Sequence, residues 1–288
     1  MTKPIRLSYS SLKQYESCPR QYNWQRIERR PRPQEESRHN AMTGTVIQAT
    51  FEHFYKNEIW RMGPDASKYL QEVSLGYLDK FLAENLVNWD DPSCRFTLID
   101  VRSELFRMIP ATVQTIKRER LLGPYAQSEI PIELYMGKDI LLGNLDFVIR
   151  TTDDKVWIFD GKATKHREER VDPDQLYFYA LLFYLRWQYM PDRLGFLYYW
   201  YTDQPEKAMD WIPVDVERVH AIKDRAEKAI AAMRRNEWQP NPTPSNCKYC
   251  AWELSCKERQ EQKAINSAKR KKNTPELPTP DDNGLIGF

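Results

Sequence analysis

The sequence of 288 residues predicts a fold that mixes α-helices and β-strands, and three observations support this. Apolar residues recur at the helical period from residue 8 to about residue 121. Short apolar segments separated by turn residues follow over residues 130–160, which is typical of neighbouring strands. The rest of the sequence returns to helices with two further strands between them, so we assign the chain to the α/β class.

The predicted helical part of the chain begins with residues 8–22. A serine in the first turn can cap this helix, and Leu12 and Tyr15 lie on its apolar side. Residues 28–40 are charged and contain prolines, so we expect a loop there. Three more helices are expected, over residues 43–61, 67–88 and 101–121.

Strands are expected next, over residues 130–135, 140–150 and 155–160. The segment Asp172-Pro173-Asp174-Gln175 favours a helix over residues 173–189, because it supplies an N-cap, a proline for the first turn and a capping glutamine. The remaining expected elements are strands over residues 194–201 and 211–214 and helices over residues 215–238 and 257–272.

The charge balance limits what the chain can bind. Lys and Arg total 43 and Asp and Glu total 41, so the net charge is +2. This excludes a polycation of the histone type, and contact with a nucleic acid has to come from local patches. No apolar run approaches the length of a membrane span, and no signal peptide is visible behind the first residues. We therefore expect a cytoplasmic protein without a membrane segment.

Three of the five cysteines lie close together, as Cys247, Cys250 and Cys256. In a reducing compartment this spacing is typical of a metal site rather than of disulfides. Three thiolates complete neither a tetrahedral zinc site nor an iron–sulfur site, so a fourth ligand is expected. Cys18, at the end of the first helix, and Cys94, in a turn, are the candidates, and chain position alone does not choose between them.

The central strands carry two aspartates that a hairpin would bring together. In a hairpin centred on Asp153, Asp146 falls opposite Asp160 on the same face of the sheet. Lys162 is two residues further along and shares that face. A shift of one residue would separate the aspartates, and a surface hairpin with ordinary charged residues is the alternative.

Such a group of side chains suits phosphodiester chemistry. Two neighbouring carboxylates repel each other unless a cation lies between them, and their oxygens suit Mg²⁺ or Mn²⁺. The metal ion can polarise a phosphodiester and lower the pKa of a water molecule, while Lys162 orients that water and balances the charge of the transition state. Gln175 and Tyr179 share a helix face and can hold a nucleotide there, or Tyr179 packs in the core.

Four motifs together resemble those of the RecB-type nucleases of the PD-(D/E)XK superfamily. The resemblance extends from Ser8 to Cys256, nearly the whole chain. The cysteine arrangement is similar to the iron–sulfur branch, which includes the CRISPR-associated single-domain exonucleases, the AddB nuclease domain and phage homologues. The matching segments are Ser8-x-Ser10-x-Leu12-x-x-Tyr15-x-x-Cys18-Pro19-Arg20-x-Tyr22, Gly143-x-Leu145-Asp146, Asp160-Gly161-Lys162 and Gln175-Leu176-x-x-Tyr179.

The resemblance implies a restriction-endonuclease-like core, in which a central mixed sheet is flanked by helices. A helical N-terminal part would precede it, and a four-cysteine region would join the two chain ends. We therefore expect a single nuclease domain over residues 1–262, with a helical insert at about residues 62–125 and a cysteine region over residues 240–260 that pairs with Cys18. Residues 263–288 would be a basic segment and a disordered tail, acidic and then apolar, able to dock a protein partner.

The resemblance also implies an activity, that of a Mg²⁺- or Mn²⁺-dependent deoxyribonuclease. The expected substrate is the end or flap of single-stranded DNA, in recombination, repair or phage replication. Cys94 would be free, and zinc in place of an iron–sulfur cluster is the alternative. The residues implied are Asp146 and Asp160 for the metal ion, Lys162 for the attacking water, Gln175 and Tyr179 for substrate, and Cys18, Cys247, Cys250 and Cys256 for a [4Fe–4S] cluster.

One position departs from the family pattern. The family's first motif reads Gly-x-x-x-His, and its histidine completes the metal shell, whereas here Gly44 is followed by Gln48. A glutamine oxygen can bind a hard cation, but it suits Mn²⁺ less well than an imidazole does. His53 would point elsewhere, and Glu129 or Glu133 could compensate. The alternative function is therefore a catalytically weak or inactive DNA-binding adaptor of the same fold.

Overall fold

The computed structural model of the chain describes residues 3–32, 38–123, 125–164, 171–201, 204–248 and 250–273. Two compact units form, one from residues 1–13 and 35–236 and the other from residues 14–34 and 237–288. No helix in the described ranges is both long and apolar enough to cross a bilayer. The single domain over residues 1–262 stays a prediction, and the predicted tail lies outside the described residues from residue 274 onward.

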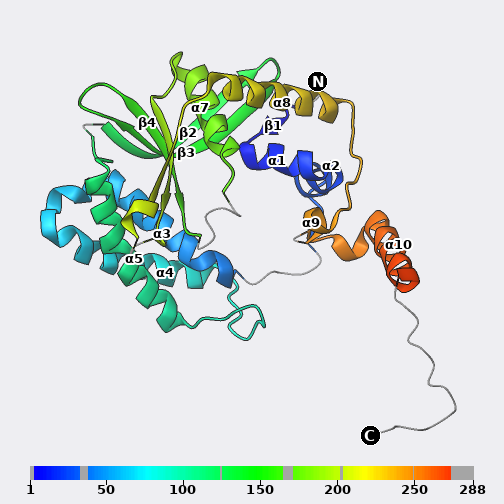
Figure 1. Cartoon of the computed structure of the whole chain (residues 1–288), viewed down its shortest axis with the longest axis horizontal. Coiled ribbons are helices and arrows are strands. Elements are labelled where there is room, and N and C mark those ends of the chain that lie inside the picture. Colours follow the sequence, from blue (N-terminus) through cyan, green and yellow to red (C-terminus); the bar gives the residue numbers. More distant parts are fainter. Residues whose placement is uncertain are drawn as a thin grey trace, which may run out of the picture. The chain divides into compact units, whose positions relative to one another are not determined.

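A mixed sheet of six strands forms the centre of the first unit (Figure 1). Its order is β1-β3-β4-β5-β6, and β2 pairs with β3 as well. β1 runs parallel to β3 and β4 parallel to β5, while the other pairs are antiparallel, so the expected α/β fold with a mixed sheet is confirmed. The strands are β1 (Arg6–Leu7), β2 (Tyr125–Met136), β3 (Asp139–Arg150), β4 (Val156–Lys162), β5 (Arg193–Tyr198) and β6 (Met209–Ile212).

The hairpin of β3 and β4 has the register that the sequence predicted. Its pairs run from Phe147 opposite Phe159 to Arg150 opposite Val156. This register corresponds to a hairpin centred on Asp153, because every pair is symmetric about that residue. The prediction on which the two aspartates depend is therefore confirmed at the level of the backbone.

One edge of β3 is left partly unpaired. β2 pairs with β3 along the whole length of that strand, so β1 and β4 must share its other edge. β1 pairs there with residues 140–141 and β4 with residues 147–150. Among the described residues, no strand therefore pairs with residues 142–146 on that edge.

Helices cover both faces of this sheet (Figure 1). Phe147 and Phe159 stack at 4.9 Å between ring centroids, inside a core that they share with α3, α4 and α5. On the face of α7, a Cβ on Gly143 would lie 2.7 Å from Leu182, so glycine permits the close approach of that helix. The helices are α3 (His39–Lys56), α4 (Ala66–Glu84) and α5 (Leu98–Arg118) on one face and α7 (Asp174–Trp187) and α8 (Val216–Arg234) on the other, with the short η2 (Ile59–Asp65) and η3 (Pro205–Lys207) between elements.

The second unit joins the start of the chain to its later part. Tyr15 contacts Tyr22 and Trp238 edge to face, at 5.7 and 6.0 Å between ring centroids. Arg20 and Glu258 form an ion pair. The elements here are the end of α1 (Tyr9–Ser17), α2 (Pro19–Tyr22), η1 (Asn23–Ile27), α9 (Pro244–Cys247), η4 (Glu253–Ser255) and α10 (Lys257–Asn273).

Two sequence predictions need correction. The single helix over residues 8–22 is divided, because Cys18 adopts an extended conformation before Pro19, as a residue preceding proline favours. The loop predicted up to residue 40 ends earlier, since α3 already begins at His39. β1 was not predicted, because two residues carry no periodic pattern.

Candidate active site

Asp146 and Asp160 lie together where β3 and β4 separate. The last pair of the ladder is Phe147 with Phe159, so each aspartate is one residue beyond it. Asp160 is only 2% exposed, and Asp146 is partly buried. Burial raises the pKa of both carboxyls, and the charge of Asp160 raises the pKa of Asp146 further.

Lys162 contacts one of these carboxylates directly. Its Nζ lies 2.5 Å from Asp160 Oδ2, and the ammonium opposes the effect of burial on the pKa of that carboxyl. The same Nζ donates a hydrogen bond to Gln175 Oε1 at 2.8 Å. Gln175 Nε2 in turn donates to Asp160 Oδ1 at 2.7 Å. The amide of Gln175 therefore fixes the lysine and the aspartate relative to each other.

Tyr179 links the same amide to the second aspartate. Gln175 Nε2 donates to the Tyr179 oxygen at 3.0 Å, and the Tyr179 hydroxyl donates to Asp146 Oδ1 at 3.3 Å. Tyr179 is 7% exposed, and burial together with the two aspartates raises its pKa. Tyr179 therefore packs in the core and also contacts Gln175 and Asp146, while its role in holding a nucleotide stays a prediction.

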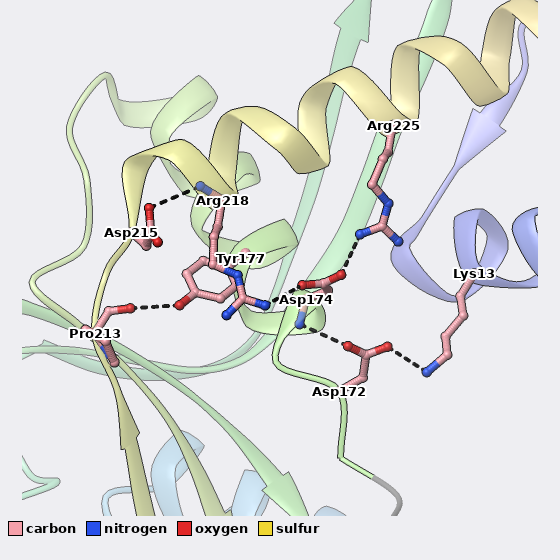
Figure 2. A network of polar contacts seen from close by, with 8 residues as sticks. All are labelled: Lys13, Asp172, Asp174, Tyr177, Pro213, Asp215, Arg218 and Arg225. Atoms are coloured by element: carbon pink, nitrogen blue, oxygen red, sulfur yellow. Dashed lines mark hydrogen bonds and ion pairs between the residues drawn. The ribbon is translucent and has the colours of Figure 1, made fainter.

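An ionic network fixes the first turn of α7, from which Gln175 projects (Figure 2). Asp174 accepts hydrogen bonds from Arg218 at 3.1 Å and from Arg225 at 2.5 Å, both on α8. Asp172 accepts one from Lys13 at 2.7 Å and one from the backbone N–H of Asp174 at 3.2 Å. Two separate parts of the first unit, α8 and the segment of Lys13, therefore hold this helix end.

Gln48, on α3, contacts Asp146 through its amide nitrogen. Nε2 donates to Asp146 Oδ2 at 3.4 Å, and the buried hydroxyl of Tyr199 donates to Gln48 Oε1 at 3.0 Å. Gly161 leaves room for this arrangement, because a Cβ there would lie 2.1 Å from the Tyr199 hydroxyl and 2.5 Å from Gln48 Oε1. His53 lies 3.4 Å from each of two tyrosine hydroxyls of α4, so it faces away, as expected.

Sequence reasoning missed Glu52, one turn after Gln48 on α3. Burial and the charge of Glu129 raise the pKa of Glu52 to about 7, and the two carboxyls share a hydrogen bond. Glu129 also raises the pKa of Asp146. Of the two glutamates considered as compensation for Gln48, Glu129 is therefore in the site, whereas Glu133 pairs with Arg6. The i, i+4 spacing from Gln48 was the available signal.

Two cavities adjoin at these residues. We name the first the carboxylate cavity; it measures about 690 Å³ and is lined by Gln48, Glu52, Asp160 and Lys162, among others. The second, the β3 cavity, measures about 630 Å³ and borders the unpaired edge of β3. Glu129, Asp146 and Gln175 line both cavities.

The second unit contains Cys18, Cys247, Cys250 and Cys256. Burial raises the pKa of the Cys247 and Cys250 thiols, and the charges of Cys18 and Cys256 raise it further. The backbone N–H of Asn241 lies 3.5 Å from Cys18 Sγ, and all these thiols are free. Cys18 therefore lies near enough to Cys247 and Cys250 to affect their pKa, and its place in a four-cysteine cluster stays a prediction.

Cys94 is placed differently. It belongs to the first unit, and its thiol lies 3.4 Å from the carbonyl oxygen of Phe96. The described residues thus distinguish Cys18 from Cys94, which the spacing of the sequence left equal.

The donor sets fit the two metal centres that the sequence suggests. Asp160 Oδ2 is a buried oxygen paired with the ammonium of Lys162, in a cavity lined by further carboxylates. Cysteine thiolates are the ligands that zinc and iron–sulfur clusters prefer. Within the described part of the chain, however, no three His, Cys, Asp or Glu side chains are gathered closely enough to hold a metal ion. Metal binding by either group is therefore a proposal.

The model of a known protein family matches most of the chain. The model of the PD-(D/E)XK nuclease superfamily matches residues 6–257, which include every residue of the site described above. The chain belongs to the PD-(D/E)XK nuclease superfamily. Among curated proteins, a sequence search finds no match to the chain.

Solved structures resemble this PD-(D/E)XK protein at low sequence identity. SSO0001 is 16% identical, with a TM-score of 0.38 over 90% of this chain and 89% of the other. A Eubacterium rectale protein named "Putative exonuclease" is 12% identical, with a TM-score of 0.46 over 89% of this chain and 87% of the other. VC1899 from Vibrio cholerae is 14% identical, with a TM-score of 0.24 over 72% and 58%.

Proposed function

We propose that this PD-(D/E)XK protein is a divalent-metal-dependent deoxyribonuclease. The observation that carries the proposal is the set of contacts among Asp160, Lys162 and Gln175, with Asp146 joined to it through Tyr179. Two buried carboxylates and a fixed ammonium in one cavity suit a hard cation and an anionic substrate.

Each residue has a proposed task in phosphodiester hydrolysis. Asp146 and Asp160 would hold a Mg²⁺ or Mn²⁺ ion, with Gln48 or Glu129 as further candidate ligands. When bound, such an ion polarises a phosphodiester and lowers the pKa of a water molecule. Lys162 orients the attacking water and balances the charge of the transition state, and Gln175 keeps its ammonium in place.

The decisive experiment is cleavage of labelled single-stranded DNA with Mn²⁺ or Mg²⁺. We expect cleavage by the wild type and a loss of about 100-fold or more in rate for Lys162→Ala. Lys155→Ala is the matched control, because Lys155 is exposed in the turn before β4. No cleavage by the wild type with any divalent metal ion would refute the proposal.

For the substrate we propose ends or flaps of single-stranded DNA, in recombination, repair or phage replication. This part rests on the four motifs that resemble RecB-type nucleases. Linear and circular single strands of the same sequence separate the possibilities, since an exonuclease degrades only the linear form. Degradation of both forms at equal rates would indicate an endonuclease instead.

We also propose a structural [4Fe–4S] cluster on Cys18, Cys247, Cys250 and Cys256, as in the iron–sulfur branch of RecB-type nucleases. The crowding of these thiols within one unit supports it. Anaerobically purified protein should be brown and absorb near about 400 nm. Colourless protein with one bound zinc ion would favour zinc.

A second candidate function is favoured by Gln48. Its amide nitrogen faces Asp146, whereas its oxygen accepts from Tyr199. In that orientation Gln48 offers no ligand to a metal ion, and the protein would bind DNA as an adaptor with little turnover. Gln48→His should then create cleavage that the wild type lacks, while an active wild type excludes this candidate.

A further inference from the structure

The β3 cavity has no assigned occupant, although it shares Glu129, Asp146 and Gln175 with the carboxylate cavity. Any molecule cleaved at Asp146 must extend to one side or the other of that residue. The β3 cavity, at about 630 Å³, is large enough for a nucleoside.

The floor of this cavity carries unused backbone hydrogen-bonding groups. Ile140 N–H donates to Ile5 O at 2.8 Å, so the polar groups of Ile140 point to the edge that β1 occupies. Alternate residues of a strand point the same way, so the N–H and C=O of Leu142 and Asn144 point to that edge too. The parallel pairing of Leu7 with Leu141 takes up the N–H of Leu142, so the Leu142 carbonyl and the peptide groups of Asn144 are those that no described strand pairs with there. Both residues line the cavity.

The walls of the cavity are largely apolar and aromatic. Ile132, Leu142 and Phe178 line it, and Tyr9 closes one side against Phe178, with 5.9 Å between ring centroids. Tyr9 is 8% exposed, and its hydroxyl lies against the carboxylate of Asp172, which adds to the effect of burial in raising the pKa of Tyr9. The cavity therefore offers flat apolar contact.

The charged residues at the rim argue against an anion. Asp172 and Glu133 line the cavity, and their charges are balanced by Lys13 and Arg6 respectively. Glu129 accepts a hydrogen bond from the Asn144 side chain at 3.0 Å. A phosphate would meet carboxylates on several sides, whereas an uncharged aromatic ring would meet apolar walls and peptide groups.

We propose that the β3 cavity binds a nucleobase of the DNA strand, next to the phosphodiester that lies at Asp146. The ring packs against Leu142 and Phe178, and its edge bonds to the carbonyl of Leu142 and to the peptide groups of Asn144. This inference rests on the proposed nuclease function for the identity of the strand, but its test measures binding rather than cleavage.

The experiment compares the affinity of short single-stranded oligonucleotides, intact or with one abasic site at each position in turn. Fluorescence anisotropy is read with Ca²⁺ in place of the catalytic ion. For the wild type, we expect one abasic position to weaken binding about tenfold. Leu142→Trp, which fills the cavity, should weaken binding of intact DNA by about the same factor and remove the effect of the abasic site.

Two further variants keep the test interpretable. Tyr135→Trp adds the same ring at a site that is 82% exposed, so it should behave as the wild type does. Tyr9→Phe keeps the ring that closes one side of the cavity and should leave the tenfold difference unchanged, with thermal melts as the check on the fold.

The outcomes separate this inference from the proposed function. Equal binding of intact and abasic DNA by the wild type would overturn the nucleobase site. An equal response of Leu142→Trp and Tyr135→Trp to the abasic site would do so as well. If Leu142→Trp alone loses the difference but the wild type never cleaves DNA, the base site stands and the nuclease proposal fails.

Discussion

The buried hydroxyl of Tyr199 donates a hydrogen bond to Oε1 of Gln48, at 3.0 Å. This contact joins the residue after β5 to α3 and orients the only amide that reaches Asp146 from α3 among the described residues. Tyr199→Phe leaves Gln48 Oε1, on a partly buried side chain, without its donor. We expect a loss of about 1–2 kcal/mol in the free energy of unfolding, measured by urea denaturation. An unchanged midpoint would mean that the hydrogen bond contributes nothing.

Gly161 should tolerate substitution even less well. A Cβ at this position would overlap the Tyr199 hydroxyl and Gln48 Oε1, so Gly161→Ala forces both to move. We expect a destabilisation of about 1–3 kcal/mol and reduced cleavage. Gly76→Ala is the matched control on α4, where nothing lies within 4 Å of a new Cβ, and it should stabilise the helix slightly.

Gln175→Ala should slow cleavage without unfolding the protein. The variant loses the amide that fixes Lys162 against Asp160, and a misplaced lysine costs about 10- to 100-fold in rate. Single-turnover cleavage measures this, with circular dichroism as the fold control. Arg186→Ala, exposed on the same helix, should match the wild type, and equal rates for all three proteins would contradict a positioning role.

Glu52→Gln should stabilise the metal-free protein at alkaline pH. The pKa of Glu52 is raised from 4.5 to about 7, so the folded state holds its proton more tightly than the unfolded state does. The favourable contribution is complete below about pH 4.5 and is lost as the pH rises through about 7. The shift corresponds to at most about 3 kcal/mol, and partial exposure reduces this to about 1 kcal/mol.

Thermal melts at about pH 5 and about pH 8 test this sign. The variant should gain stability over the wild type only at the higher pH. Glu72→Gln, at an exposed position of α4, is the control and should show no such difference. A gain at the lower pH alone would contradict the shared proton between Glu52 and Glu129.

Binding of Mn²⁺ should release protons. Burial raises the pKa of Asp146 and Asp160, and a metal ion requires both carboxylates in their charged form. The apparent affinity for Mn²⁺ should therefore increase with pH. Calorimetry in two buffers of different ionisation enthalpy measures the released protons, and a binding enthalpy independent of the buffer would argue against the assignment.

Much of the active site could be predicted from the sequence because its parts are close along the chain. Asp146 and Asp160 belong to one hairpin, whose register follows from a short turn, and Gln175 begins the next helix. Glu52 escaped prediction because its partner Glu129 lies on a distant strand. Nothing local in the sequence indicates such a pair.

The contact of Tyr199, the residue after β5, could not be predicted for the same reason. Tyr199 carries no sequence signal for its contact with Gln48, because the two meet only when α3 packs against the sheet. β1 escaped prediction for a similar reason, since its two residues become a strand only through β3. The unpaired stretch of β3, and the β3 cavity beside it, exist because β1 and β4 each pair with only part of that edge. The sequence does not show where those two pairings end.

Arg218 and Arg225 both form ion pairs with Asp174, and these pairs have a consequence for experiments at high ionic strength. Dissolved salt weakens such partly exposed pairs at the same concentrations at which it strips a protein from DNA. Loosening the start of α7 would release Gln175 and, with it, Lys162. A salt titration of DNA cleavage would then measure two effects together: the loosened arrangement of Gln175 and Lys162 and the weaker binding of DNA.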